Sequence, residues 1–286
     1  DFPDPFAAHP LLRSRGRPLA RSRSRFRRAS PAVTCGRRPH CFGAVSPGEW
    51  TAWVSGARPA VAVIIPALDE EDAIVRVLGD IPDELSATVI VVDNGSTDRT
   101  AARARDCGAT VVAEPRSGYG QACLAGLAAL PEGVDIVVFL DGDYSDYPSE
   151  MSTLVEPIAR DAADLVIGSR VLGETETGAL LPQARVGNAL ATWLIRHLFG
   201  VKYTDLGPFR AVRLTALKKL HMADRNFGWT VEMQVKAARR GLRIAEVPVR
   251  YRRRIGKSKI TGTFLGSVRA GYKILWTIFR RSGGQR

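Results

Sequence analysis

The stretch Ile136-Val137-Val138-Phe139-Leu140-Asp141-Gly142-Asp143 joins a run of apolar residues to two carboxylates. A short apolar run of this kind is typical of a strand that is buried on both faces of a parallel sheet. Similar runs recur along the chain, and helical patterns of roughly a dozen residues separate several of them. The predicted strands cover residues 61–65, 89–92, 110–113, 136–140 and 165–168, and the predicted helices cover 69–79, 97–107 and 119–130. This alternation predicts an α/β fold with a mostly parallel sheet and helices on both faces.

The composition excludes several classes of protein. The chain has 286 residues, of which 45% are hydrophobic, an ordinary fraction for a globular core. Wholesale disorder is therefore excluded. Four cysteines are too few for a disulfide scaffold of this length. No apolar run reaches about 18 residues without a charge, so the sequence predicts no transmembrane helix.

Charge is distributed unevenly along the chain. Residues 1–58 carry eleven Arg against three acidic residues, and residues 250–286 carry eleven basic residues and no acidic one. Residues 59–249 carry 19 basic and 26 acidic residues. Because a nucleic-acid-binding protein usually has a basic body, this pattern favours a metal-using body with a basic end that meets anions. A basic adaptor that binds nucleic acid through its two ends is the alternative from a different class.

Residues 1–58 show no sustained helical or strand period and are rich in Arg, Ser, Pro and Gly. Such a segment buries too little apolar surface to offset its ordering entropy, so we expect a disordered tail. Its composition fits a transit peptide. The lack of a methionine before Met151 fits at least as well the alternative that this segment is sequence upstream of the true start of the protein. We therefore expect a tail at 1–58, the main domain at 59–259 and a basic amphipathic helix at 260–286.

Asp141 and Asp143 lie two residues apart, directly after a predicted strand. In extended chain they point to one side, and Gly142 lets a ligand approach the backbone closely. Two carboxylates held together repel each other unless a proton or a cation lies between them. Because oxygen ligands suit a hard divalent ion, the pair predicts a Mg²⁺ or Mn²⁺ site that can also hold a diphosphate. A solvated acidic turn is the alternative.

Asp93 follows the predicted strand at 89–92, where a carboxylate can accept hydrogen bonds from a base or a ribose. The chain has no GxGxxG after its first strand and no GxxxxGK[ST], which argues against a nicotinamide cofactor and a P-loop. Gly118-Tyr119-Gly120 opens a predicted helix and either offers N–H groups to a phosphate or forms a plain tight turn.

Four of these segments together resemble glycosyltransferase family 2, whose members have the Rossmann-like GT-A fold. They are Val63-Ile64-Ile65-Pro66-Ala67-Leu68-Asp69-Glu70, Val91-Val92-Asp93-Asn94-Gly95-Ser96-Thr97-Asp98, Asp141-Gly142-Asp143 and Ile167-Gly168-Ser169-Arg170, in the family's order and spacing. Over about residues 60–280, the chain is most similar to the dolichyl- or polyprenyl-phosphate hexose synthases. The resemblance implies an inverting transfer of one hexose from GDP-mannose or UDP-glucose, with Mg²⁺ or Mn²⁺ at Asp141 and Asp143. The Gln-x-x-Arg-Trp signature of processive polysaccharide synthases is missing, which favours a single sugar transfer.

The same resemblance implies roles for individual residues. The nucleotide pocket would be lined by Pro66, Leu68, Glu70, Val91 and Asp93, and the metal and diphosphate would be held by Asp141, Gly142 and Asp143. In the basic segment 252–259, Arg253 and Lys259 would reach the donor diphosphate. Ser145 stands where the polyprenyl synthases often have a Gln that binds the metal.

On the acceptor side, Arg170 and Arg185 match arginines that grip the acceptor phosphate in the polyprenyl synthases. Arginine suits this role because it binds phosphate in a planar, bidentate way. We therefore expect Asp143, Arg170 and Arg185 to carry catalysis. The alternatives are an ordinary salt bridge for Arg170 and an exposed helix charge for Arg185.

The acceptor chemistry determines whether a general base is needed. Glu232, close to a predicted helix start, is either such a base or a residue that favours the helix N-terminus. A phosphate monoester is mostly ionised at pH 7 and needs no base, whereas a hydroxyl does. We therefore favour a lipid-phosphate acceptor over a soluble or protein hydroxyl, and a nucleotidyltransferase is a further alternative.

Residues 264–279 form an apolar run that is interrupted by Arg269 and Lys273, four residues apart on one helical face. This pattern suits a helix in the interface of an anionic membrane, a helix packed on the body, or both. We expect a peripheral protein on the cytoplasmic face of a membrane. Its expected partners are a nucleotide sugar and a lipid phosphate, and no nucleic acid.

Overall fold

The computed structural model of the protein describes residues 58–256 and 271–279. The predicted tail, apart from Arg58, lies outside the described residues. So do Lys259 and most of the predicted C-terminal helix.

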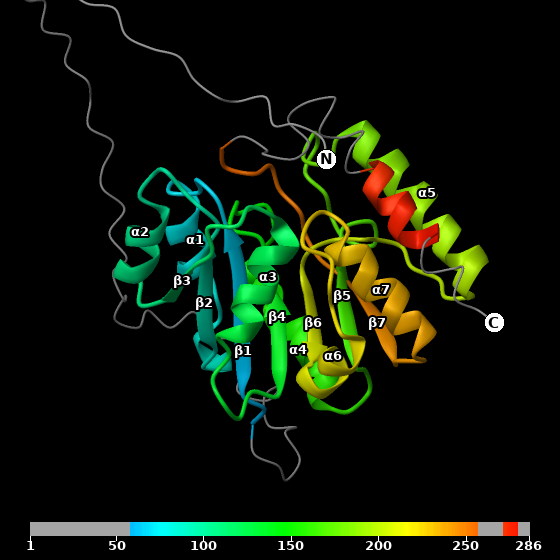
Figure 1. The fold of residues 1–286 in the computed structure, drawn as a ribbon, viewed down its shortest axis with the longest axis horizontal. Coiled ribbons are helices and arrows are strands. Elements are labelled where there is room, and N and C mark those ends of the chain that lie inside the picture. The colour runs from blue at the N-terminus through cyan, green and yellow to red at the C-terminus, as the bar shows by residue number, and fades with distance from the viewer. Residues whose placement is uncertain (1–57, 257–270, 280–286) are drawn as a thin grey trace, which may run out of the picture. The chain divides into compact units, whose positions relative to one another are not determined.

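A seven-stranded sheet forms the centre of the described structure, in the order β3-β2-β1-β4-β6-β5-β7 (Figure 1). The strand β6 is antiparallel to β4 and β5, and every other pairing is parallel. The strands are β1 Val61–Ala67, β2 Thr88–Asp93, β3 Thr110–Ala113, β4 Ile136–Phe139, β5 Leu165–Ser169, β6 Arg210–Arg213 and β7 Ile244–Pro248. The predicted mostly parallel α/β sheet is confirmed.

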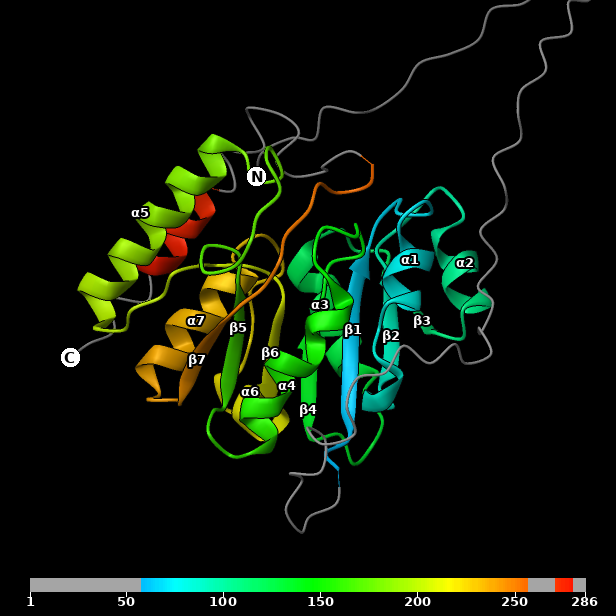
Figure 2. The same ribbon diagram turned by 180° about the vertical axis from the view of Figure 1, so that it is seen from behind.

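Helices cover both faces of this sheet (Figure 2). One core layer joins the sheet to residues of α3, α5, α6 and α7, and the other joins it to residues of α1, α2 and α4. The helices are α1 Ile74–Gly79, α2 Thr100–Asp106, α3 Tyr119–Ala128, α4 Met151–Ala159, α5 Pro182–Phe199, α6 Leu214–Leu220 and α7 Trp229–Arg239. Two 3₁₀ turns, η1 Asp83–Leu85 and η2 Pro148–Glu150, complete the named elements.

The strand β1 shows why an unbroken apolar run predicted a buried strand. Ile64 packs into one core layer, and its neighbours Val63 and Ile65 pack into the other. All three side chains are fully buried. Because successive strand side chains face opposite sides, a strand covered on both faces must be apolar at every position.

The first two helices are shorter than predicted, because a hydrogen-bonded turn replaces their first residues. Asp69 has a left-handed φ of 50°. Its backbone N–H donates to Ser96 Oγ at 3.0 Å, and its Oδ1 accepts the Thr97 N–H at 2.7 Å. These contacts tie the loop after β1 to the loop after β2, so α1 begins at Ile74 and α2 at Thr100.

The helix α5 and the helical residues 271–279 lie side by side in both views (Figures 1 and 2). Pro182 begins α5 and Gly200, with a φ of 71°, ends it. Ile278 is fully buried in the same core layer as Ile195 of α5. None of the helices in the described ranges has both the length and the apolar character needed to cross a membrane.

Candidate active site

The carboxyl ends of β1, β2 and β4 meet at one edge of the sheet, because these strands are parallel neighbours. A pocket of about 250 Å³ opens at this edge. Six residues that were predicted to bind the donor line it: Pro66, Leu68, Glu70, Asp141, Gly142 and Asp143. We call this cavity the donor pocket.

Asp141 and Asp143 have different surroundings in the donor pocket. The Tyr119 hydroxyl donates to Asp141 Oδ1 at 3.0 Å. Ser145 donates to Asp143 Oδ1 twice, through its backbone N–H at 2.9 Å and its hydroxyl at 2.6 Å. Burial raises the pKa of Asp141 to about 7, and the charge of Asp143 adds to this rise. A cation would therefore lower the cost of ionising Asp141.

Arg254 reaches into the donor pocket and lies between two carboxylates. Its Nη2 is 2.9 Å from Glu70 Oε1, and its Nη1 is 3.1 Å from Asp143 Oδ2. The surrounding chain is fixed by backbone hydrogen bonds, because Arg252 N donates to Ser145 O and Ile255 N donates to Asp143 O, each at 2.9 Å. Sequence reasoning did not identify Arg254 as a site residue.

Arg253, which was predicted to reach the donor diphosphate, is not among the described residues that line the donor pocket. Its Nε and Nη2 both donate to Thr177 O, at 3.0 and 2.7 Å. Side chains alternate along extended chain, so neighbours at 253 and 254 face opposite sides. The structure thus places Arg254, and not Arg253, in the lining of the donor pocket.

Two residues predicted on β2 lie outside the lining of the donor pocket. Val91 is fully buried in the hydrophobic core, where it pairs with Ile65 of β1. Asp93 Oδ1 accepts the Ser96 N–H at 2.9 Å, which shapes the loop after the strand. The next residue, Asn94, does line the pocket, and its Oδ1 accepts the Gly118 N–H at 2.9 Å. Asn94 therefore holds the start of α3 beside the donor pocket.

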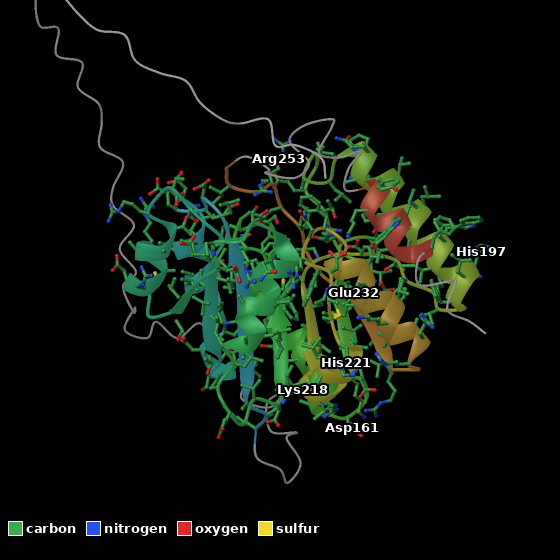
Figure 3. The ribbon with its side chains drawn as sticks, in the orientation of Figure 1. Asp161, His197, Lys218, His221, Glu232 and Arg253 are labelled. Atoms are coloured by element: carbon green, nitrogen blue, oxygen red, sulfur yellow. The ribbon has the colours of Figure 1, made fainter. Side chains whose placement is uncertain are left out.

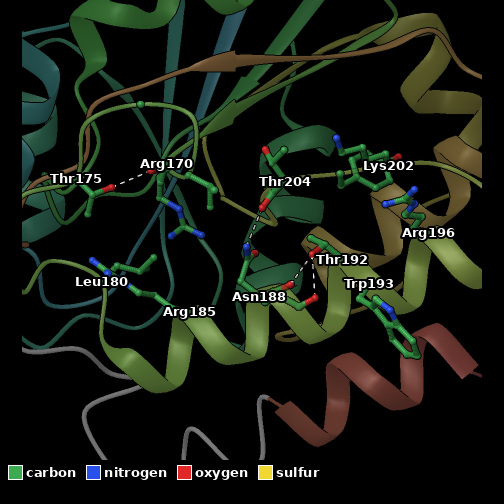
Figure 4. A pocket seen from close by; sticks show the side chains of 14 residues that line it. Arg170, Thr175, Leu180, Arg185, Asn188, Thr192, Trp193, Arg196, Lys202 and Thr204 are labelled. Carbon is green, nitrogen blue, oxygen red and sulfur yellow. Dashed lines mark hydrogen bonds between the residues drawn. The ribbon is translucent and has the colours of Figure 1, made fainter.

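A second pocket, of about 570 Å³, lies along α5 (Figure 4). Its lining includes four cationic side chains and no carboxylate among the described residues: Arg170, Arg185, Arg196 and Lys202. Arg170 and Arg185 are at one end, and Arg196 and Lys202 are at the other. Both arginines predicted on the acceptor side thus border one cavity, which we call the basic pocket.

Arg170 forms a salt bridge in addition to lining the basic pocket. Its Nε and Nη2 lie 2.7 and 2.8 Å from the two oxygens of Asp205, which is fully buried. Burial alone would raise the pKa of Asp205. The hydrogen bonds and the positive charge of Arg170 outweigh burial, so the pKa of Asp205 lies below its usual range. Asp205 therefore fixes the orientation of Arg170 and offsets its charge.

Comparison with known proteins assigns the family. The model of glycosyl transferase family 2 matches residues 62–220. The chain belongs to glycosyltransferase family 2. An uncharacterized glycosyltransferase of Mycobacterium tuberculosis is 40% identical over 214 residues, covering 74% of this chain and 94% of the relative. The prediction of a family 2 glycosyltransferase is confirmed.

Two further relatives are described by their acceptors. A dolichyl-phosphate hexose transferase of Haloferax volcanii is 36% identical over 219 residues, which covers 75% of this glycosyltransferase and 92% of the relative. An undecaprenyl-phosphate mannosyltransferase of Micrococcus luteus is 31% identical over 227 residues, which covers 72% of this glycosyltransferase and 89% of the relative.

Solved structures confirm the predicted GT-A fold of this glycosyltransferase. The glucosyl-3-phosphoglycerate synthase of Mycobacterium tuberculosis superposes with a TM-score of 0.63 at 26% identity, covering 80% of this chain and 81% of the other. That structure contains Mn²⁺, UDP and glucosyl-3-phosphoglycerate. A second structure of the same enzyme, with phosphoglyceric acid, has a TM-score of 0.63 at 27% identity. The match covers 80% of this chain and 81% of the other.

Glu232 of the glycosyltransferase is fully buried and lies at the start of α7 (Figure 3). Its Oε1 is 2.7 Å from Lys236 Nζ, and its Oε2 accepts the N–H groups of Ala223 and Asp224 at 3.1 and 2.6 Å. A carboxylate with these partners holds a loop and is poorly placed to collect a proton from a substrate. The interpretation of Glu232 as a helix-start residue fits these contacts better than its interpretation as a base.

The oxygen atoms at the donor pocket suit a hard divalent cation, but the described protein groups alone would not complete its coordination. The described ranges hold no cluster of three or more His, Cys, Asp or Glu side chains suited to a metal. Magnesium is commonly bound by one or two carboxylates together with substrate phosphates and water. Asp141 and Asp143 fit that arrangement.

Asp146 is a further buried carboxyl group near this pair. Neither of its side-chain oxygens has a hydrogen-bond partner among the described residues. Burial raises the pKa of Asp146 well above its usual range, and the charge of Asp141 adds to the rise. Without a cation, Asp141 and Asp146 are thus held partly or wholly in their neutral forms, and a divalent cation bound beside them would favour their ionised forms.

Proposed function

We propose that this enzyme transfers one hexose from a nucleotide-diphosphate sugar, GDP-mannose or UDP-glucose, to a polyprenyl phosphate. In this proposal, the donor occupies the donor pocket and the acceptor phosphate enters the basic pocket. The observation that carries the proposal is the lining of the basic pocket, which has four cationic side chains and no described carboxylate. The relatives that act on dolichyl and undecaprenyl phosphate support it.

A divalent cation, Mg²⁺ or Mn²⁺, would be held by Asp141 and Asp143 and would neutralise the donor diphosphate. The related structure with Mn²⁺ and UDP supports this assignment. Pro66, Leu68 and Glu70 would contact the nucleotide from the end of β1, and Asn226 and Phe227 would contact the donor from the loop before α7. Arg254 would face the diphosphate, because its guanidinium already lies beside Asp143.

In the proposed reaction, an oxygen of the acceptor phosphate attacks the anomeric carbon of the hexose. The bond from that carbon to the donor diphosphate breaks, the nucleoside diphosphate leaves with the electron pair, and the configuration inverts. The acceptor is already ionised at pH 7, so the step needs no general base. Arg185 would position the acceptor phosphate, while Arg170, oriented by Asp205, would add positive charge at the same end of the pocket.

Exposed apolar side chains next to the basic pocket would place the enzyme on the cytoplasmic face of a membrane. On α5, Val186, Leu190 and Trp193 are 69%, 45% and 54% exposed. On the neighbouring helical residues 271–279, Tyr272 and Phe279 are 69% and 53% exposed. Aromatic and aliphatic side chains beside basic residues suit the interface of an anionic membrane.

A soluble acceptor with two anionic groups is the second candidate. Arg185 and Arg196 are eleven residues apart on α5, about 16 Å along a helix axis, so the basic pocket has a cation at each end. In a long acceptor, a phosphate at one end and a carboxylate at the other would each meet a cation, whereas the two groups of a three-carbon acid would both meet Arg170 and Arg185 at one end. The related synthase that binds phosphoglyceric acid favours this candidate.

The proposal is tested by comparing acceptor kinetics of Arg185→Ala and Glu232→Gln. If the acceptor is a phosphate, Arg185→Ala should raise the KM for the acceptor about tenfold, since one charge-assisted contact is lost. Glu232→Gln should leave the KM for the acceptor unchanged, because the partners of Glu232 are Lys236 and the amides of the loop before α7. Normal acceptor kinetics in Arg185→Ala would overturn the proposal.

A further inference from the structure

The loop of residues 223–228, between α6 and α7, forms one wall of the donor pocket. Asn226 and Phe227 are the two residues of this loop that line the pocket. The loop belongs to a segment far from the strand ends in sequence. The contacts that hold this loop in place therefore set the position of Asn226 and Phe227.

The first anchor is the start of α3. Gln121 N donates to Arg225 O at 2.9 Å. The loop backbone passes so close to Gly118 and Gly120 that a Cβ atom at either position would collide with the carbonyl oxygen of Arg225 or Asp224. These two glycines therefore allow the loop to close directly onto the donor pocket.

The second anchor is Asp224, which links the loop to α7 and to the helical residues 271–279. Its Oδ1 accepts the N–H groups of Asn226 and Gly228 at 2.8 and 3.2 Å, which fixes the turn that presents Phe227. Its own N–H donates to Glu232 Oε2, and its Oδ2 lies 3.0 Å from Lys273 Nζ. The Asp224 side chain is 6% exposed and that of Lys273 is 34% exposed. This ion pair is therefore partly shielded from water and stronger than a fully exposed pair.

Lys273 belongs to the helical residues 271–279, which pack firmly on the body. Thr277 and Ile278 are 2% and 0% exposed. A Cβ atom at Gly228 would be 2.8 Å from Thr277 Oγ1, so this helix also touches the end of the loop. The C-terminal helix and the donor-pocket wall are thus joined through Lys273, Asp224 and Gly228.

We propose that Lys273 is a positioning residue for donor binding: through Asp224, it holds the loop 223–228 so that Asn226 and Phe227 face the donor. The C-terminal helix then contributes to the donor pocket without lining it. The expected effect on nucleotide-sugar binding rests on the proposed function. The expected effect on the loop itself does not.

The test compares Lys273→Met with Lys219→Met, which removes an exposed lysine on α6 and serves as the matched control. Hydrogen exchange at the Asn226 and Gly228 amides should rise at least about fivefold in Lys273→Met and stay unchanged in the control. With Mn²⁺ present, the KM for the nucleotide sugar should rise about three- to tenfold at constant kcat. Lys273→Arg should restore both values, because it keeps the charge that pairs with Asp224.

Unchanged amide exchange in Lys273→Met would overturn the inference, and so would faster exchange with normal donor affinity. A second variant, Asp224→Asn, retains an acceptor for the two loop amides and loses only the ion pair, so it should match Lys273→Met. If the wild-type enzyme binds no nucleotide sugar, the proposed function fails, and the exchange data still support or overturn the positioning role of Lys273.

Discussion

Replacing Arg254 with alanine should impair use of the donor far more than the same change at Arg253. Arg254 makes two charge-assisted contacts in the donor pocket, at 2.9 and 3.1 Å, and its side chain is 29% exposed. A charge-assisted contact from this guanidinium to the donor diphosphate would be worth about 1.5–3 kcal/mol, and the partial exposure favours the lower end. A loss of about 1.5 kcal/mol corresponds to roughly a tenfold fall in kcat/KM for the nucleotide sugar.

The matched control is Arg253→Ala, because its guanidinium donates to the Thr177 carbonyl away from the donor pocket. We expect it to change kcat/KM by less than about threefold. Titration with Mn²⁺ in the absence of nucleotide gives a second measurement. Removing the Arg254 cation from Asp143 should tighten Mn²⁺ binding, because like charges compete for one carboxylate. Equal effects of the two variants, or a larger effect of Arg253→Ala, would refute this assignment.

Three further predictions concern the donor and basic pockets. Asp143→Ala should lower turnover at least about a hundredfold, because the diphosphate charge would go unneutralised; full turnover in the presence of a chelator would contradict a metal at this site. In the metal-free enzyme, the pKa of Asp141 is raised to about 7, so the protonated form of this residue stabilises the folded state. This stabilisation is lost as the pH rises through 7. In Asp141→Asn, the thermal midpoint should therefore fall less steeply between pH 5.5 and 8 than it does in the wild-type enzyme. An unchanged slope would show that another group is responsible. Arg170→Ala should destabilise the fold by about 3–5 kcal/mol by leaving buried Asp205 unpaired, whereas Arg170→Lys should fold and bind the acceptor more weakly, as denaturant unfolding and acceptor kinetics would show.

The parallel strands β1, β2, β4 and β5 were predictable because each contains an apolar run that lies in the buried core. The parallel strand β7 was not predicted, because its sequence, Ile244-Ala245-Glu246-Val247-Pro248, contains a charge and a proline and its side chains are only partly buried. The antiparallel strand β6 was not predicted, because its sequence, Arg210-Ala211-Val212-Arg213, is short and begins and ends with a charge. Arg210 is nevertheless fully buried, and its guanidinium donates to the carbonyl oxygens of Thr230 and Leu206. Thr230 belongs to α7, so only the folded chain brings this acceptor to Arg210.

Helix starts were less predictable than strands, and for a related reason. Asp69 and Glu70 fit the first turn of a helix by composition, yet Asp69 bonds to Ser96 and Thr97 in the next loop. Local propensity cannot reveal a partner that lies 27 or 28 residues away.

The strand ends at Pro66 and Asp141 were identified from sequence because polar residues directly after buried strands gather at one edge of the sheet. Arg254 was missed because alternation shows that residues 253 and 254 face opposite sides but does not show which one faces the donor pocket. Asp146 carries no motif of its own, and its burial follows from the path of the chain beside Tyr251, with which it forms a β-bridge.

The most direct test of the account is the fate of a labelled hexose when the purified enzyme is given Mn²⁺, GDP-mannose or UDP-glucose, and two acceptors together. One acceptor is undecaprenyl phosphate in anionic vesicles, and the other is 3-phosphoglycerate in solution. We predict that the label enters the lipid fraction as a glycosyl polyprenyl phosphate and that Asp143→Ala abolishes this product. Label found only on phosphoglycerate, with none in the lipid fraction, would contradict the proposed acceptor.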